Sequence, residues 1–177
     1  MSVKKLEGKN IYLGPLQKKD LEKYLKWLHD MDVHKFTDQP SKLMTLEDEE
    51  EWYDRARKNK NSWHFAIYLK NEAIGVCGIS NFDRIDRTAV IGISIGEKKH
   101  WNKGYGTEAI KLLLDYGFNI LNLNNIMLTV KDFNERARRC YEKAGFKEFG
   151  RRRKSEYFGG EYHDAVYMDI LKEEFEK

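Results

Sequence analysis

The sequence predicts a single α/β (α+β mixed) domain over residues 1–177, with a mixed central sheet flanked by helices. Three observations favour this fold. Strand-like and helix-like patterns alternate along the second half of the chain. Only two prolines occur, Pro15 and Pro40, and no linker rich in Pro, Ser or Gly divides the chain. Hydrophobic residues make up 41% of the 177, which is enough to fill one sizeable core.

The first third of the chain predicts one strand and two helices. Residues 10–14 form the strand, and residues 20–28 form an amphipathic helix. Its apolar positions at i, i+3, i+4 and i+7 are Leu21, Tyr24, Leu25 and Leu28. Residues 31–44 have no regular pattern. Thr45 can cap a second helix with Asp48 three residues on, although Glu or Gln fits a capping box better.

The middle of the chain predicts three strands. Residues 63–69 are rich in aromatic and aliphatic side chains, and Asn71-Glu72 makes a tight turn into a second strand at residues 73–79. A polar loop, Asp83–Arg87, then leads to a third strand at residues 89–95. These strands are expected to pair in an antiparallel way.

The last third changes period and predicts two helices among strands. A largely buried helix covers residues 107–121, and residues 125–130 form a strand. Residues 134–144 form a second helix, which ends at Gly145. Gly159-Gly160 indicates a closing hairpin, so the expected order is β-α-α-β-β-β-α-β-α-β-β.

Composition excludes several classes of function. A net charge of +3 is too small to indicate nucleic-acid binding by itself. Cys77 and Cys140 form no CxxC pair, and the five histidines show no metal-ligand spacing. Residues 1–10 lack the apolar run of a signal peptide, and no segment approaches the roughly 18 apolar residues of a membrane helix. We therefore expect a cytoplasmic protein without a metal, a membrane or a direct nucleic-acid partner.

The most informative segment is a glycine-containing loop at residues 100–109, between a strand and a strong helix. Gly104 and Gly106 allow a tight turn that exposes backbone N–H groups, and the next helix adds its own free N–H groups and positive dipole end. Such a site accepts phosphate oxygens. Three lysines add positive charge beside it: Lys98, Lys99 and Lys103. By itself, the loop could also be a plain helix start with turn glycines, which is the less favoured interpretation.

Two familiar phosphate motifs do not fit this loop. With Ala109 it satisfies the dinucleotide pattern GxGxxA, but that pattern belongs directly after a strand in a parallel βαβ unit. Here polar residues intervene after Ile95, and no acidic residue follows at the expected distance of about 20 residues. A P-loop is excluded because no GK[ST] is present.

Three segments together resemble the GNAT superfamily of N-acetyltransferases. Residues 96–109, GEKKHWNKGYGTEA, resemble its acetyl-CoA pyrophosphate loop, usually written [QR]xxGx[GA]. Residues 134–146, NERARRCYEKAGF, resemble its NxxAxxxYxKxGF signature in the expected order and separation. The ending at residues 158–168 is similar to the hairpin of the branch that holds ribosomal-protein N-terminal and spermidine acetyltransferases. The resemblance implies acetyl-CoA as cosubstrate, a splayed sheet and the option of a homodimer.

The resemblance also implies roles for matching residues. Asn134 contacts pantetheine or stabilises the splayed strands, and Tyr141 gives a proton to the departing CoA thiolate. Without the motif, Tyr141 would be read as a core aromatic residue. Backbone N–H groups near the end of the third strand can polarise the thioester carbonyl: Ile93, Ser94 and Ile95. The pyrophosphate is bound by the backbone of Trp101, Asn102, Lys103, Gly104, Tyr105, Gly106 and Thr107.

The general base is missing from its usual place. Relatives in this branch often carry Glu at the position that aligns with Val90. We expect deprotonation through water or another polar group, with Glu97 and His100 as candidates. An α-amine with a pKa near ~8 needs less help than a lysine-like amine near ~10, which slightly favours a protein N-terminus as acceptor.

The acceptor amine stays open. Peptide N-termini, polyamines, amino sugars and aminoglycosides all fit, and neither cysteine has a His partner, so direct transfer in a ternary complex is expected. The acidic run Glu47–Glu51 could attract a cation or be the solvated face of a helix. Arg151–Lys154 could touch RNA but is more typical of an exposed strand. The alternative to an enzyme is a non-catalytic acetyl-CoA-binding regulatory module.

Overall fold

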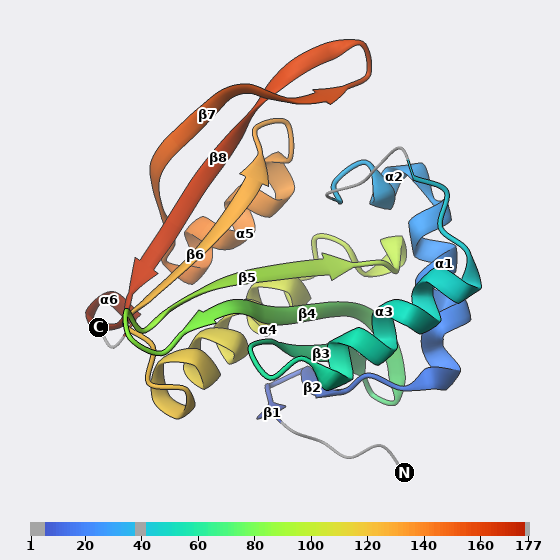
Figure 1. The fold of residues 1–177 in the computed structure, drawn as a ribbon, viewed down its shortest axis with the longest axis horizontal. Helices are drawn as coiled ribbons and strands as arrows, with labels where there is room; N and C mark the ends of the chain where they lie inside the picture. Colours follow the sequence, from blue (N-terminus) through green and yellow to red (C-terminus); the bar gives the residue numbers. More distant parts are fainter. Residues whose placement is uncertain (1–5, 38–41, 176–177) are drawn as a thin grey trace.

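The computed structural model describes residues 6–37 and 42–175 and contains one eight-stranded sheet in the order β1-β2-β3-β4-β5-β6-β8-β7 (Figure 1). The strands are β1 (Leu6–Glu7), β2 (Ile11–Pro15), β3 (Trp63–Leu69), β4 (Glu72–Asp83), β5 (Thr88–Ile95), β6 (Asn125–Lys131), β7 (Lys147–Phe158) and β8 (Glu161–Leu171). The helices are α1 (Leu21–His29), α2 (Met31–His34), α3 (Leu46–Lys58), α4 (Tyr105–Asp115), α5 (Glu135–Ala144) and α6 (Lys172–Phe175).

The sheet is split at its one parallel pair. All other neighbouring strands are antiparallel, but β5 and β6 run parallel and pair only from Thr88 to Val90. Beyond Val90, β6 turns away from β5, as Figure 1 shows. The remainder of β5, Ile91–Ile95, therefore has a strand partner on one side only. This confirms the mixed, splayed sheet.

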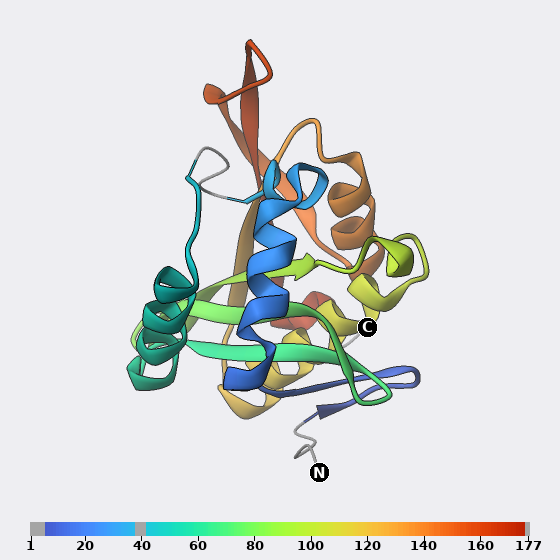
Figure 2. The same cartoon turned by 90° about the vertical axis from the view of Figure 1, so that its right-hand side faces the viewer.

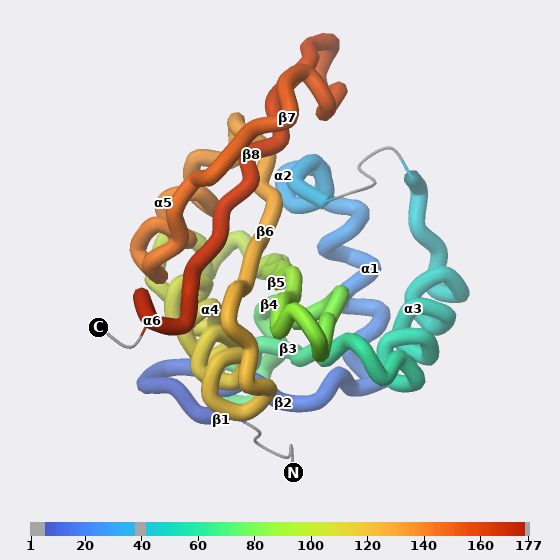
Figure 3. Tube along the Cα trace, turned by 60° about the vertical axis from the view of Figure 1, so that its left-hand side comes forward, coloured from blue at the N-terminus to red at the C-terminus, as the bar shows by residue number. Residues whose placement is uncertain are grey.

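Helices cover both faces of the sheet. Alternate residues of β3 point to opposite faces, so Phe65 and Ile67 join the core under α4 and α5, whereas Ala66 and Tyr68 join the core under α1. Figures 2 and 3 show α1 and α3 on one side of the sheet and α4 and α5 on the other. The single α/β fold predicted from the sequence is confirmed.

The predicted elements are found with three differences. A short helix, α2, lies in the stretch 31–44 that had no regular pattern, and residues 38–41 of that stretch are outside the described residues. Two short elements at the ends, β1 and α6, were not predicted. The helix predicted for 107–121 is α4 followed by a π-helical turn, Tyr116–Ile120. The wider turn places Gly117 against β6, where an added Cβ would lie 2.7 Å from Ile126.

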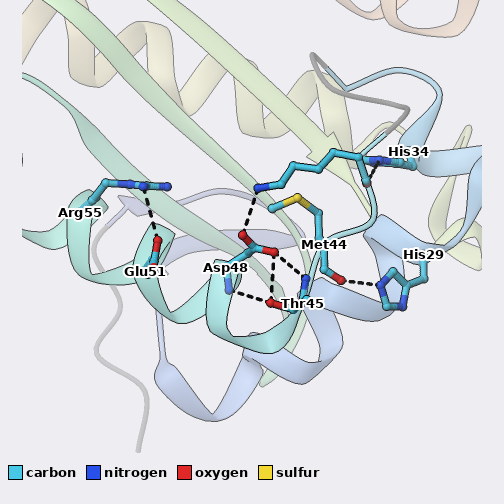
Figure 4. Close-up of polar contacts among 8 residues, drawn as sticks. His29, His34, Met44, Thr45, Asp48, Glu51 and Arg55 are labelled. Atoms are coloured by element: carbon cyan, nitrogen blue, oxygen red, sulfur yellow. Dashed lines mark hydrogen bonds and ion pairs between the residues drawn. The ribbon is translucent and has the colours of Figure 1, made fainter.

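Local sequence signals fix the ends of two helices and the last hairpin. Thr45 Oγ1 accepts a hydrogen bond from Asp48 N (3.2 Å), and the Asp48 carboxylate accepts one from Thr45 N (2.8 Å), so Asp completes the capping box (Figure 4). Gly145 ends α5 in the left-handed region at φ +104°. Gly159 and Gly160 also have positive φ and turn β7 into β8, as predicted.

Across residues 6–37 and 42–175, no helix combines the length and the hydropathy that crossing a bilayer requires. Nor does the described chain bring together three His, Cys, Asp or Glu side chains as candidate metal ligands.

Candidate active site

A cleft of about 1400 Å³ opens where β5 and β6 diverge. One wall comes from the end of β5, the start of α4 and α5, and the other from α1 and α3. All twelve candidate site residues line it: Ile93, Ser94, Ile95, Trp101, Asn102, Lys103, Gly104, Tyr105, Gly106, Thr107, Asn134 and Tyr141. The twelve residues selected from the sequence therefore lie along one continuous wall of the cleft.

The loop before α4 has the geometry of an anion cradle. Gly104 is the N-cap of α4 and adopts φ +85°, a conformation that glycine reaches without strain. Nothing lies within 4 Å of a Cβ added there, so the surface beside it is open. Trp101 Nε1 donates to Ile95 O at 2.6 Å and holds the loop against β5. The free N–H groups of the first turn of α4 therefore face the cleft beside an open backbone turn.

Only one of the three expected lysines serves this loop. Lys103 lines the cleft. Lys98 instead forms ion pairs with Asp30 (2.7 Å) and Asp32 (3.0 Å), and Lys99 lies 3.7 Å from Glu72. The short 3₁₀ turn that contains Lys98 and Lys99 directs both toward acidic groups outside the cleft. The expectation that they add charge at the loop was wrong.

Helix α5 supplies positive groups that the sequence analysis missed. Arg136, Arg139 and Lys143 line the cleft. The Arg136 guanidinium carbon lies 3.4 Å from the centre of the Trp101 ring, which joins α5 to the loop. Burial lowers the pKa of Arg136, but from a value so high that it stays charged. The sequence could have indicated this cluster, because Arg136, Arg139 and Lys143 are spaced at i, i+3 and i+7, which places them on one face of a helix.

Tyr141 projects from α5 and is only 6% exposed. Its ring packs edge-on against Phe146, with centroids 6.0 Å apart. Burial is the main cause that raises the pKa of Tyr141 well above its ordinary value, so the phenol keeps its proton at neutral pH. A buried, protonated phenol that lines a cleft can act as a proton donor.

Asn134 stands at the start of α5. Its carboxamide oxygen accepts a hydrogen bond from Ala137 N at 3.2 Å and so caps the helix that carries Tyr141. Next to Tyr141, Cys140 accepts a hydrogen bond from Thr107 Oγ1 at 3.4 Å, which ties α5 to the first turn of α4. Asn134 thus fixes the start of α5, and the hydrogen bond between Thr107 and Cys140 holds α5 against α4.

The two candidate bases differ in position. Glu97 accepts a hydrogen bond from Trp27 Nε1 (3.2 Å), lies 3.4 Å from Lys23, and is not among the residues that line the cleft. His100 lines the cleft beside the loop, and burial followed by the charge of Lys99 lowers its pKa. His100 is therefore neutral at pH 7. Glu97 supports the packing of Trp27 rather than the cleft.

The opposite wall carries a buried carboxylate that the sequence analysis did not single out. Glu49 on α3 lines the cleft with Tyr24, Trp52 and His64, and is only 4% exposed. Burial is the largest cause that raises its pKa, followed by the charge of Asp48. The sequence could have indicated this burial, because Glu49 lies three residues before Trp52 and so shares its helix face.

The rest of the acidic run Glu47–Glu51 is the solvated face that one interpretation expected. Asp48 completes the helix cap, and Glu51 lies 3.9 Å from Arg55 (Figure 4). Glu50 lies 3.1 Å from Lys18. Glu49 alone in this run is buried.

The splayed cleft, with a backbone turn suited to an anion, nearby positive groups and a buried phenol, fits a transferase that takes its group from a phosphate-containing carrier. The family model for the acetyltransferase (GNAT) domain matches residues 10–147. The chain belongs to the GNAT acetyltransferase family, and it is an N-acetyltransferase with acetyl-CoA as its cosubstrate.

Similar proteins cover nearly the whole chain. A spermidine N(1)-acetyltransferase of Escherichia coli (strain K12) is 27% identical over 94% of this chain and 88% of its own. YdaF of Bacillus subtilis (strain 168), by name a candidate ribosomal N-acetyltransferase, is 31% identical over 85% of this chain and 79% of its own. The crystal structure of a spermidine N-acetyltransferase from Vibrio cholerae in complex with CoA and spermine has a TM-score of 0.86 and 26% identity. The match covers 96% of this chain and 100% of that chain.

Proposed function

We propose that the chain transfers the acetyl group of acetyl-CoA directly to a primary amine of a polyamine, with both substrates in the cleft at once. The observation that carries the proposal is the cleft itself, which has Tyr141 and the Gly104 turn on one wall and Glu49 on the other. A covalent acyl-enzyme has no support, because burial raises the pKa of both Cys77 and Cys140 and leaves them as thiols.

The CoA end of the proposal rests on the loop at residues 101–107. Its backbone and the first turn of α4 would bind the pyrophosphate, with Lys103 and Arg136 as neighbouring charges. The pantetheine arm would follow the free edge of β5 at Ile93–Ile95 beside Asn134. N–H groups on that edge would stabilise negative charge that develops on the thioester oxygen.

Tyr141 would act as the proton donor to the leaving sulfur. The amine nitrogen forms a bond to the acetyl carbon, the carbon–sulfur bond breaks, and the thiolate takes the phenol proton. The leaving sulfur, whose conjugate thiol has an ordinary pKa of about 8.5, would take that proton as the carbon–sulfur bond breaks, with the phenol hydrogen-bonded to the sulfur. The proton that the amine gives up then restores the phenol through water.

Deprotonation of the incoming amine would rely on water. Val90 offers no carboxylate, and its carbonyl oxygen accepts a hydrogen bond from Ser80 Oγ at 3.4 Å. His100 is neutral and is the available side-chain base on the loop, whereas Glu97 lies outside the cleft lining. A free amine fraction in solution would therefore contribute to turnover, and the rate would rise with pH until the amine has lost its proton.

Two acceptor classes come from the relatives. The spermidine acetyltransferases match over almost the whole chain and favour a polyamine over the N-terminal α-amine that the missing carboxylate slightly suggests. The buried Glu49 is a second reason for a polycationic acceptor. A peptide N-terminus is the second candidate, supported by the similarity to YdaF.

The test is CoA-thiol release from acetyl-CoA with spermidine, a short peptide, an amino sugar and an aminoglycoside. Tyr141→Phe should lower kcat by about 10²- to 10⁴-fold, as for loss of a general acid. Tyr116→Phe is the matched control, because Tyr116 is also buried but does not line the cleft. CoA-thiol release with the peptide alone would identify a peptide N-terminus, and not a polyamine, as the acceptor. Binding of acetyl-CoA without any turnover would favour a regulatory module.

A further inference from the structure

We propose that Glu49, with Tyr24 and Trp52, forms a subsite for a second, non-reacting ammonium group of the acceptor. This inference rests on the proposed acetylation of a polyamine and names how the second charge is recognised. The reacting amine would lie at the splay of β5 and β6, and the second ammonium group would lie under α3.

Two buried polar groups in this subsite have no partner among the described residues. Glu49 is only 4% exposed, and no described side chain donates a hydrogen bond to its carboxylate or forms an ion pair with it. The Tyr24 hydroxyl is fully buried and also without a described hydrogen-bond partner. Burial is the main cause that raises the pKa of the Tyr24 phenol, followed by Tyr68, Asp20 and Tyr53, and the nearby charge of Glu49 adds a smaller increase. The Glu49 carboxylate lines the cleft without a partner of its own in the described chain, and an ammonium group bound there would pair with it.

Aromatic rings form the sides of the subsite. The ring centroids of Tyr24 and Trp52 are 6.4 Å apart in an edge-on arrangement, and those of Trp52 and His64 are 5.9 Å apart. The faces of Tyr and Trp rings attract cations. Burial lowers the pKa of His64, so the imidazole is neutral and does not repel a cation.

The cationic side chains on the same wall are already paired. Arg55 lies 3.9 Å from Glu51 (Figure 4). Lys42 Nζ lies 3.0 Å from Asp48. Both line the cleft, yet each has its own carboxylate on α3. The charge that Glu49 adds to this wall is therefore left for a ligand.

The sheet register places the subsite about two strands away from the splay. Trp52 packs on His64 of β3, and His64 pairs with Gly78 of β4, which pairs with Gly92 of β5. Two strand spacings of about 4.8 Å make roughly 10 Å. Gly92 has nothing within 4 Å of an added Cβ, so no side chain blocks the path from His64 across Gly78 to β5 at Gly92. An acceptor with two ammonium groups separated by a chain of about that length would fit.

The experiment compares octylamine with octane-1,8-diamine, which differ only in the second amine. The wild type should acetylate the diamine with a KM about 10- to 100-fold lower, the effect expected of a hydrogen-bonded charge in a buried site. Glu49→Gln should remove this advantage by raising KM for the diamine while kcat and the values for octylamine change little. Glu49→Asp, which keeps the charge, should recover part of it.

Glu47→Gln is the matched control, because Glu47 lies on the same helix but is exposed and not part of the cleft lining. An unchanged preference for the diamine in Glu49→Gln would overturn the subsite while leaving the acetyltransfer proposal intact. An equal fall in kcat for both amines would overturn it too, since that result assigns Glu49 to the reacting amine.

Calorimetric titration of the diamine into the CoA complex separates the two proposals if neither amine is acetylated. Loss of binding in a folded Glu49→Gln protein would support the ammonium subsite even though the polyamine reaction fails. Equal binding by wild type and variant would overturn the subsite as well.

Discussion

The two walls of the cleft recognise their ligands by different means. The CoA wall, built from the end of β5, the loop at residues 101–107, α4 and α5, offers backbone N–H groups at the Gly104 turn and several exposed cations. The opposite wall of α1, α3 and β3 offers aromatic rings around one buried carboxylate, Glu49. A site that binds its ligand through backbone N–H groups needs glycines at a fixed spacing, and this spacing can be recognised in a sequence. A site that binds through one side chain produces no such motif. The difference explains why the cosubstrate is readable from the sequence and the acceptor is not.

The largest effect on stability is expected at Gly96, where the two walls touch. An added Cβ would lie 1.9 Å from Trp27, so Gly96→Ala must displace that ring. We expect a loss of about 1–3 kcal/mol in the free energy of unfolding, from overpacking. Trp27 packs against Tyr24, with ring centroids 5.2 Å apart, so the displacement should also raise KM for the amine more than Kd for CoA. Urea unfolding and the two binding measurements test this, and an effect on CoA alone would contradict it.

Gly104→Val should act on the CoA wall alone. At φ +85° a β-branched residue is strained by about 1–2 kcal/mol, so the free loop should relax to another backbone conformation. CoA binding must then restore the turn, and Kd for CoA should rise about 5- to 30-fold. Gly92→Ala is the control, because Gly92 also has free space around an added Cβ but has no positive φ. Calorimetric titration with CoA should show no change in this control. If both substitutions weaken CoA equally, the effect comes from bulk and not from the backbone turn.

Much of the fold follows from local patterns in the sequence. The Thr45 cap and the Gly159-Gly160 turn are decided by contacts within a few residues, and so they were predictable. Where β6 leaves β5 after Val90 depends on packing between distant elements, which no local pattern reports. The split of the sheet came from family resemblance instead.

Charged residues were harder to place than apolar ones. Lys98 and Glu49 each belong to a run of like charges whose members the sequence does not distinguish. The helical turn that carries each residue decides whether it meets solvent, an ion-pair partner or the cleft. For Glu49, the neighbouring Trp52 and Tyr53 pack against the core under α1 and draw that face of α3 inward. For Lys98, the aspartates at 30 and 32 come from an element 66 residues away in the chain.

Thr45→Ala should have a smaller effect, confined to the acceptor wall. Loss of an N-cap costs about 1 kcal/mol, and the turn that carries Glu49 begins at this cap. Hydrogen bonds from Thr45 N, Lys42 and Thr45 Oγ1 lower the pKa of Asp48 to about 2. The stabilisation of α3 that ionised Asp48 contributes is therefore fully present above the pKa of Asp in the unfolded chain, near ~3.9. It is lost as pH falls through the folded-state pKa of about 2.

Urea unfolding of wild type and Thr45→Ala at several pH values measures this effect. The difference between the two proteins should be largest at neutral pH and should narrow in acid. A difference that grows in acid would contradict the capping role of Asp48, and a change in Kd for CoA would contradict the separation of the walls.

The smallest effect is expected from Lys98→Ala. Lys98 is exposed and paired with Asp30 and Asp32, so its removal should change Kd for CoA by less than about twofold. Lys103→Ala should raise Kd by up to about fivefold, because an exposed charge next to the loop contributes at most about 1 kcal/mol. Only the Lys103 effect should shrink with added salt, since it alone involves the phosphates. Equal effects of the two lysines on CoA binding would mean that the positive field around the loop matters more than the position of each charge. The CoA wall would then be less sharply defined than its backbone suggests.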